Sequence, residues 1–475
     1  MYIEAGGIVT MRRARSKNKK KEQKILIGSV AVLGTLLVIY LSMSFYFTKN
    51  FYFGTTINGI KAGGKTIEEV NNEIAKSIDK YTLTLVERKD TKEEIKGTDI
   101  GLKYSEVYKV EEVKSKQRPF KWLTGSFNKK NYTLSEIISF DEKLLMRKID
   151  NLSCFVGKDI TEPKDASFKY TDKGYEIVEE VNGNKVIKEK LVEEVKQGII
   201  NLKSSLNLDK AQCYEKPKYT KDSKEIIETK NLLNKYISSN ITYTFGDNTE
   251  VLDASIFNTW INVNENLEVA IDEEKVKNYV KTLSNKYDTY GITRSFTTST
   301  GRVVNIKGGN YGYKINRSKE SSEIIEAIKQ GEGIKKKTSY AQTAKGPLGS
   351  DIGNTYVEID MSKQHLWLYK NKTLLAEGDI VTGNMSKNYS TPAGTYRLTY
   401  KQKDATLKGT DYETPVSYWM PFNGNIGLHD ATWRKTFGGN IYQKEGSHGC
   451  VNAPFGLAEI VFNNIEAGTP VVCYY

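Results

Sequence analysis

An uncharged run near the N-terminus most constrains how this chain can fold. Residues 25–47 contain no Asp, Glu, Lys or Arg, and about 20 apolar residues in a helix cross the hydrocarbon core of a bilayer. Tyr40 and the three aromatic residues 45–47 lie toward one end of the run, as in an interfacial belt. A cleaved signal peptide is the alternative, but its apolar region is about 7–15 residues long and ends in small residues. The sequence therefore predicts a retained transmembrane helix at 25–47.

Half of the net charge of +12 precedes this run. Residues 1–24 hold eight basic and two acidic side chains, and basic residues mark the cytoplasmic end of a membrane helix. We predict a cytoplasmic basic tail at 1–24, a single-pass type II topology, and an extracellular location for everything after residue 50. The other half of the net charge is spread thinly over the rest of the chain, so no nucleic-acid partner is expected.

Two stretches between residues 50 and 340 indicate a diverged internal repeat. Asp141 and Asp272 each open a helical stretch, and Gly198 and Gly331 each follow the end of one, at nearly the same offset along the chain. Asp is a favoured helix N-cap and Gly a favoured C-cap. The pattern predicts two α+β modules, at 48–220 and 221–340. A linker or a tight connection rich in small residues follows at 341–354.

The modules contain no histidine and no cluster of residues that carries chemistry. They either bind a ligand or act as a spacer that sets height above the membrane. The four cysteines lie far apart without a C-x-x-C pair, which disfavours zinc knuckles and iron–sulfur sites. Pairing of Cys154 with Cys213 remains open. No metal or other cofactor is expected.

Residues 355–475 form the third region, where short alternating runs are separated by turns about every ten residues. Tyr356–Asp360 and His365–Tyr369 alternate as strands do. The predicted fold class is α+β, with a β-rich C-terminal catalytic domain preceded by the two α+β modules and one transmembrane helix.

Two of the three histidines and one of the four cysteines fall within the segment 429–450 of this domain. His429 lies eighteen residues before the segment 447–452, which reads Ser-His-Gly-Cys-Val-Asn. A cysteine nucleophile needs a nearby base to form its thiolate. We therefore predict that Cys450 is the nucleophile, that His429 is its base, and that His429 makes the thiol more acidic than its reference pKa of about 8.5.

The residues beside Cys450 fit the rest of an acyl-transfer site. An oxyanion intermediate needs hydrogen-bond donors, and the backbone N–H groups of Gly449 and Cys450 are candidates. Gly449 also lacks the Cβ that would crowd a substrate carbonyl. Ser447 either braces the loop or binds substrate.

The pattern H-x17-S-H-G-C-x-N resembles the active-site motif of the L,D-transpeptidase catalytic domain of the YkuD type. The resemblance extends over 356–475 and includes the strand at 359–366, Thr382-Gly383, the TPAG run at 391–394 and the WMPF run at 419–422. It implies that Cys450 is the nucleophile and His429 the general base. It also implies that Ser447, His448 and Gly449 contact substrate or form the oxyanion pocket.

The family resemblance implies acyl transfer on peptidoglycan stem peptides during bacterial cell wall biogenesis. A tetrapeptide donor would form a cysteine thioester and release D-Ala, and the diamino acid of an acceptor stem would resolve it as a 3→3 cross-link. L,D-carboxypeptidase activity, attachment of proteins to the wall, and a non-catalytic wall-binding scaffold are the alternatives. The middle modules resemble peptidoglycan-binding modules, so the extracellular domains would face the wall.

Several roles stay open. The residue after His429 is Asp430, whose carboxylate either orients the imidazole or points to solvent. His429, His448 and Cys450 are also possible zinc ligands, although a His-x-Cys pair is unusual spacing for that metal. His448 either packs the loop or contacts substrate. His365 is expected in the core or on the surface, and Cys473 is expected as a buried small hydrophobic residue in the final strand.

Overall fold

The computed structural model describes residues 7–105, 109–409 and 413–475. Its helices and sheets form two compact units, one of residues 1–167 with 178–221 and one of residues 168–177 with 222–475. The predicted class, α+β with a β-rich C-terminal domain and one apolar N-terminal helix, is confirmed.

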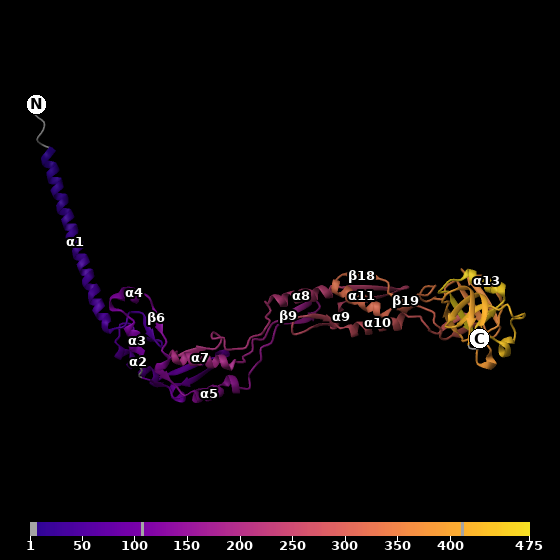
Figure 1. Ribbon diagram of the computed structural model, residues 1–475, viewed down its shortest axis with the longest axis horizontal. Helices are drawn as coiled ribbons and strands as arrows, with labels where there is room; N and C mark the ends of the chain where they lie inside the picture. The colour runs from indigo at the N-terminus through magenta and orange to yellow at the C-terminus, as the bar shows by residue number, and fades with distance from the viewer. Residues whose placement is uncertain (1–6, 106–108, 410–412) are drawn as a thin grey trace, which may run out of the picture. The chain divides into compact units, whose positions relative to one another are not determined.

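The apolar run forms part of one long helix, α1 (Gly7–Lys49), drawn in indigo in Figure 1. Within Lys21–Lys49 the most apolar window of 18 residues has a mean hydropathy of 2.4, and this window is not buried against the protein. Among the described residues it is the one helix long and apolar enough to cross a membrane. A signal sequence near an N-terminus also meets the same limits of length and composition.

The first module packs helices against a three-stranded sheet of order β10-β3-β4, in which β3 pairs with β4 antiparallel and with β10 parallel. Its core holds Cys154 and Cys213 as buried, free thiols, so the possible disulfide is not formed. The strands are β1 (Thr55–Ile57), β2 (Ile60–Lys61), β3 (Thr82–Val86), β4 (Lys92–Lys96), β5 (Lys103–Tyr104), β6 (Lys130–Tyr132), β7 (Ile138–Ser139) and β10 (Ser205–Asn207). The helices are α2 (Ile67–Asp79), α3 (Lys109–Ser115), α4 (Trp122–Phe127), α5 (Glu142–Asp150), α6 (Ser153–Val156) and α7 (Lys188–Ile200).

The second module repeats this topology with β12-β11-β18, again with one antiparallel and one parallel pairing. Helices α10 and α11 pack beside each other (Figure 1). The helices are α8 (Lys224–Ile237), α9 (Ala254–Phe257), α10 (Glu273–Tyr287) and α11 (Arg317–Gln330). The strands are β11 (Asn240–Phe245), β12 (Asn248–Leu252), β13 (Ile261–Val263), β14 (Val269–Ile271), β15 (Arg294–Thr297), β16 (Val303–Ile306), β17 (Lys314–Ile315), β18 (Gly333–Lys336) and β19 (Tyr340–Gln342).

Three of the four predicted helix caps are confirmed. The side chains of Asp141 and Asp272 accept backbone N–H groups at the starts of α5 and α10, and Gly331 ends α11 in a left-handed conformation. Gly198 is different. It lies inside α7, which continues to Asn201 as its C-cap, and its bare Cα lets Leu83 of β3 pack at van der Waals distance.

One hairpin that was expected in the first module belongs to the second compact unit. Strands β8 (Ser167–Thr171) and β9 (Gly174–Val178) belong almost entirely to the second unit, although residues 48–220 were expected to form the first module. The side chain of Asn234 on α8 accepts the Tyr175 N–H at 2.8 Å, and the Tyr175 hydroxyl donates to the Asn258 carbonyl at 3.2 Å. These contacts hold the hairpin on the second module.

The C-terminal domain contains a five-stranded sheet of order β22-β21-β20-β28-β23 and a four-stranded sheet of order β24-β25-β26-β27. Helix α13 contributes four of its side chains to the core shared with both sheets. The strands are β20 (Tyr356–Asp360), β21 (His365–Lys370), β22 (Thr373–Asp379), β23 (Gly394–Arg397), β24 (Gln402–Lys408), β25 (Glu413–Asn423), β26 (Ile426–Asp430), β27 (Val451–Ala453) and β28 (Pro470–Tyr474). The helices are α12 (Ile441–Glu445) and α13 (Phe455–Asn464).

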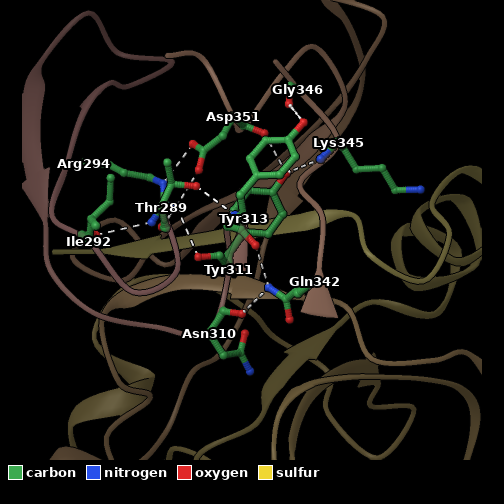
Figure 2. A network of polar contacts seen from close by, with 11 residues as sticks. Thr289, Ile292, Arg294, Asn310, Tyr311, Tyr313, Gln342, Lys345, Gly346 and Asp351 are labelled. Atoms are coloured by element: carbon green, nitrogen blue, oxygen red, sulfur yellow. Dashed lines mark hydrogen bonds and ion pairs between the residues drawn. The ribbon is translucent and has the colours of Figure 1, made fainter. Parts of the chain in front are cut away.

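The connection at 341–354 is held by a buried polar network rather than being an open linker (Figure 2). Arg294 pairs with Asp351 through two contacts of 3.0 and 2.6 Å, and both residues are buried. The remaining guanidinium N–H groups donate to backbone carbonyls, including that of Thr289 at 2.5 Å. The hydroxyl of Tyr311 donates to the Asp351 carbonyl at 2.7 Å, and that of Tyr313 donates to the Gly346 carbonyl at 2.8 Å. All three guanidinium nitrogens and both carboxylate oxygens of the ion pair therefore have hydrogen-bond partners inside the protein.

The second module also docks on the C-terminal domain. Thr395 of β23, an outer strand of the five-stranded sheet, exchanges backbone hydrogen bonds with the loop at Gly308 and Tyr311, at 3.2 and 3.1 Å. The fully buried carboxylate of Glu358 on β20 accepts the backbone N–H and the hydroxyl of Ser299 at 2.8 and 2.6 Å. The loop thus extends the sheet at β23.

We expect Asp351→Ala to loosen this connection strongly. Removing one partner of a buried ion pair leaves an uncompensated charge and costs about 3–5 kcal/mol. Hydrogen exchange of the full chain should show amide protection around residues 341–354 falling at least about a hundredfold.

The control is Glu274→Ala, which removes an exposed pair with Lys277 on α10 and is worth at most about 1 kcal/mol. Unchanged protection in Asp351→Ala would contradict a structural role for the network.

Candidate active site

Parallel pairing of β26 with β27 brings together residues from the two halves of the predicted motif. The register places His429 opposite Asn452 and Leu428 opposite Val451. Cys450 directly precedes β27, so the same pairing sets the position of the cysteine beside the histidine strand.

The hydrogen bonds of His429 define its tautomer. Nδ1 lies 2.8 Å from the backbone carbonyl of Asp430, which only an N–H can satisfy. Nε2 is therefore the unprotonated nitrogen, and it lies 3.0 Å from the Asn452 amide nitrogen. Arg434 Nε donates to Asn452 Oδ1 at 2.9 Å, which turns the amide NH₂ toward the imidazole. The chain Arg434, Asn452, His429 thus holds the imidazole with a lone pair on Nε2.

Asp430 acts on His429 in two ways. Its main-chain carbonyl, rather than its carboxylate, accepts the imidazole N–H and orients the ring. The carboxylate is buried and accepts the Tyr418 backbone N–H at 2.8 Å. Burial lowers the pKa of His429, and the negative charge of this carboxylate raises it again and offsets part of that lowering.

The loop before Cys450 is shaped by Gly449. Its φ of +118° is one that side-chain-bearing residues rarely adopt, and a Cβ there would lie 3.3 Å from the Ile426 side chain. Backbone conformation and the Ile426 side chain therefore favour glycine here, and room for a substrate carbonyl stays a prediction. The Gly449 N–H donates to Ser447 Oγ at 3.1 Å, so this N–H, expected in the oxyanion pocket, is engaged within the loop. Ser447 in turn donates to the Cys450 carbonyl at 2.5 Å, which makes it a brace.

Thr391 fixes the peptide bond between Gly449 and Cys450. Its buried hydroxyl donates to the Gly449 carbonyl at 2.7 Å and accepts the Gly383 N–H at 3.0 Å. In a planar trans peptide the C=O and N–H point in opposite directions. Anchoring the Gly449 carbonyl on Thr391 therefore directs the Cys450 N–H away from Thr391.

Cys450 and His429 open onto one pocket of about 250 Å³. The thiol donates to the Asn425 carbonyl at 3.5 Å, while His429 Nε2 is bonded to Asn452. The lining of the pocket combines aromatic, charged and small polar residues with one leucine, and comprises Leu407, Thr414, His429, Trp433, Arg434, Gly446, Ser447, His448, Cys450 and Asn452.

The electrostatics of the pair differ from those expected. Burial raises the pKa of the Cys450 thiol to about 11, although a hydrogen bond from the Gly427 backbone offsets part of this. Burial also lowers the pKa of His429. The prediction of an acidified thiol is therefore wrong for this state, because desolvation disfavours both charged forms. At neutral pH the pair is a thiol and a neutral imidazole rather than a thiolate and an imidazolium.

The other predicted residues lie at different places in the C-terminal domain. His448 is exposed at the pocket and its ring lies 4.9 Å from that of Tyr389. His365 lies on β21, where Nδ1 is 2.7 Å from Asp379. Cys473 is fully buried in β28. Within the described ranges, no group of three or more His, Cys, Asp or Glu side chains is arranged to hold a metal ion.

Sequence reasoning missed the roles of Asn452, Arg434 and Thr391. Asn452 and Thr391 stood inside the quoted motifs without an assigned function. Arg434 had no local signal, since its contact with Asn452 depends on the strand pairing.

Two family models match the chain. Residues 354–473 match the L,D-transpeptidase catalytic domain of the YkuD type. Residues 93–206 and 219–335 each match a peptidoglycan binding domain. No curated protein was found to match the chain.

Solved structures of L,D-transpeptidases are similar to this chain. The Ldtfm–avibactam carbamoyl enzyme is 33% identical over 53% of this chain and 99% of its own, with a TM-score of 0.44. The chain belongs to the L,D-transpeptidase family. A cysteine-to-serine variant of the Enterococcus faecium L,D-transpeptidase is 32% identical over 53% of this chain and all of its own, with a TM-score of 0.43. The isolated catalytic domain from E. faecium is 42% identical over 26% of this chain and 97% of its own, with a TM-score of 0.24. The protein is thus an acyltransferase whose substrate is peptidoglycan.

The raised pKa of Cys450 predicts how its alkylation depends on pH. About one thiol in ten thousand is ionised at pH 7 when the pKa is about 11. The rate of iodoacetamide alkylation at Cys450, followed by mass spectrometry of the full chain, should therefore rise about tenfold per pH unit from 7 to 9.

A plateau below pH 8 would instead reveal a preformed thiolate. His429→Ala serves as the matched variant, since it removes any imidazolium that would create such a plateau.

Proposed function

We propose that this protein forms 3→3 cross-links between peptidoglycan stem peptides through a thioester on Cys450. The observation that carries the proposal is the shared pocket, in which Cys450 lies beside a histidine whose Nε2 lone pair is fixed by Asp430, Asn452 and Arg434. A neutral thiol with a neutral base nearby suits general-base activation at the moment of attack.

In the first half-reaction the thiol proton passes to His429 Nε2, and the Asn452 hydrogen bond to that nitrogen breaks as the proton arrives. The sulfur attacks the carbonyl carbon of the third residue of a tetrapeptide donor. Collapse of the tetrahedral intermediate breaks the amide bond, and the leaving D-Ala amine takes the proton from His429. The product is an acyl thioester on Cys450.

In the second half-reaction the side-chain amine of an acceptor stem attacks the thioester. His429 removes a proton from this amine and returns it to the departing sulfur. The new amide bond links two third residues and Cys450 is again a thiol. Water as the acceptor would give carboxypeptidase activity by the same steps.

The oxyanion donor in this scheme is the Cys450 N–H, because the Gly449 N–H is held by Ser447. Thr391 is a positioning residue for it, since it orients the peptide that carries this N–H. A preoriented donor stabilises the developing charge more than the ground-state carbonyl.

We also propose that α1 anchors the chain in the cell membrane in a type II orientation, with both modules and the catalytic domain outside the cell. The basic residues before the apolar run support this orientation. The two copies of a peptidoglycan binding domain support a location at the wall.

The cross-linking reaction is tested with the full chain, purified disaccharide-tetrapeptides and mass spectrometry. We expect a dimer that has lost one D-Ala, and a transient protein adduct that maps to Cys450. Cys450→Ala should abolish both, because a thioester needs the sulfur. His429→Ala should lower the rate at least about a hundredfold.

The matched control is Cys473→Ala, a buried thiol in β28 that should leave the rate unchanged. An adduct at another residue would contradict the assignment. Release of D-Ala without a dimer would replace cross-linking with hydrolysis.

The role of Thr391 predicts that removing its hydroxyl slows acylation of the Cys450 thiol but not its alkylation. In Thr391→Val the Cys450 N–H loses its fixed direction, so acylation by tetrapeptide should fall roughly ten- to a hundredfold. Alkylation by iodoacetamide forms no oxyanion and should keep its rate. Both are measured on one sample by intact-protein mass spectrometry.

Thr391→Ser keeps the hydroxyl and should restore most of the acylation rate. An equal loss of acylation and alkylation in Thr391→Val would show that Thr391 supports only the fold of the loop.

A further inference from the structure

A short segment of the first module exposes large apolar side chains to solvent. The 3₁₀ turn Pro119–Lys121 and helix α4 carry Phe120, Leu123 and Phe127, whose exposed fractions are 65%, 49% and 83%. Three exposed apolar side chains in so short a segment are more than scattered surface residues, and such a cluster marks a contact surface. We call these three side chains the apolar patch.

The segment that carries the patch is fixed against helix α1. The Tyr40 hydroxyl donates to the Phe120 carbonyl at 2.6 Å, and Trp122 Nε1 donates to the Tyr40 carbonyl at 3.3 Å. The Trp122 ring stacks on Phe47 with centroids 5.8 Å apart. The Tyr52 hydroxyl also bonds the Arg118 carbonyl. The patch therefore has a defined place beside the apolar helix.

That place lies at the level of a membrane surface. One side of the last part of the apolar run is covered by the first module, since Ser44 and Phe47 are buried, while Phe45 is 77% exposed. The Lys114 ammonium donates to the Phe47 carbonyl at 2.8 Å on the covered side. Residues 25–43 precede this cover, and a helix of about 19 residues spans about 28 Å at about 1.5 Å each. This length matches a hydrocarbon core of about 30 Å. Tyr40, which contacts the patch segment, lies one turn inside the covered end.

We propose that the apolar patch inserts into the outer leaflet of the bilayer and forms a second membrane contact beside the anchor. The proposal rests on the membrane anchoring of α1 proposed above, and the occupant it names is lipid. Charge complements this choice, because residues 118–130 contain no acidic residue and the exposed Arg118, Lys121, Lys129 and Lys130 flank the patch. Basic side chains at this level meet lipid phosphates while the aromatic rings enter the acyl region.

Two contacts constrain the first module more than one does. A single helix leaves a domain free to rotate and tilt about its anchor, whereas a side patch inserted near the same helix fixes which face of the module lies on the membrane. Gly125 helps to present the patch, because a Cβ there would collide with the Tyr52 ring on which the segment rests.

The test uses the full chain in lipid vesicles, labelled with an environment-sensitive fluorophore at one cysteine. The background is Cys450→Ser, since the other three native cysteines are buried. Labels are placed by Phe120→Cys and Phe127→Cys, by Leu33→Cys in the anchor, and by Val156→Cys, an exposed position on the same unit away from the patch segment. Quenching is measured with spin-labelled lipid and with aqueous iodide.

We expect the labels at 120, 127 and 33 to be quenched by lipid and protected from iodide, and the label at 156 to be quenched by iodide. Lipid quenching at 33 but iodide quenching at 120 and 127 would overturn the patch and leave the anchor standing. Iodide quenching at 33 would overturn the anchor and the patch together. Protection at 120 and 127 from both quenchers would show that protein covers the patch, which also overturns insertion into lipid.

Discussion

The site depends on the parallel pairing of β26 with β27. This pairing sets His429 opposite Asn452 and so connects two segments separated by a long stretch of irregular chain and a short helix. The same register places Cys450 at the start of β27, where the loop turns through the positive φ of Gly449. Thr391 donates to the Gly449 carbonyl and Ser447 accepts the Gly449 N–H, so the two side chains hold the peptide groups on either side of Gly449. Loss of the pairing would separate His429, Asn452 and Cys450 at once.

Features that depend on residues close together in the sequence could be predicted, whereas features that depend on distant residues could not. Local patterns and spacing predict the apolar helix, the two Asp caps and the presence of a His and Cys site. The structure confirms the helix and the caps. The Gly198 cap was wrong because Leu83, which is distant in the sequence, needs the space beside a glycine inside the helix. The grouping of residues 168–177 with the second unit depends on the contact of Tyr175 with Asn234, which local pattern does not reveal.

The electrostatics of the site show the same limit. A His near a Cys in sequence suggests an ion pair, but the pKa of each group depends on how much water the fold removes. Burial lowers the pKa of His429 and raises that of Cys450, and the contact that orients the imidazole comes from a main-chain carbonyl. Residue spacing reveals neither the desolvation of a side chain nor the direction of a main-chain carbonyl, so only the structure shows these two features.

The docking of the loop at Gly308 and Tyr311 on Thr395 has a further consequence for solubility. An outer strand presents unpaired N–H and C=O groups that invite strands of other chains. On β23 the loop of the preceding module takes up these groups, and on the opposite outer strand, β22, the acidic side chains of Glu377 and Asp379 discourage pairing. The second module therefore covers an edge of the C-terminal sheet at which another chain could otherwise pair and aggregate.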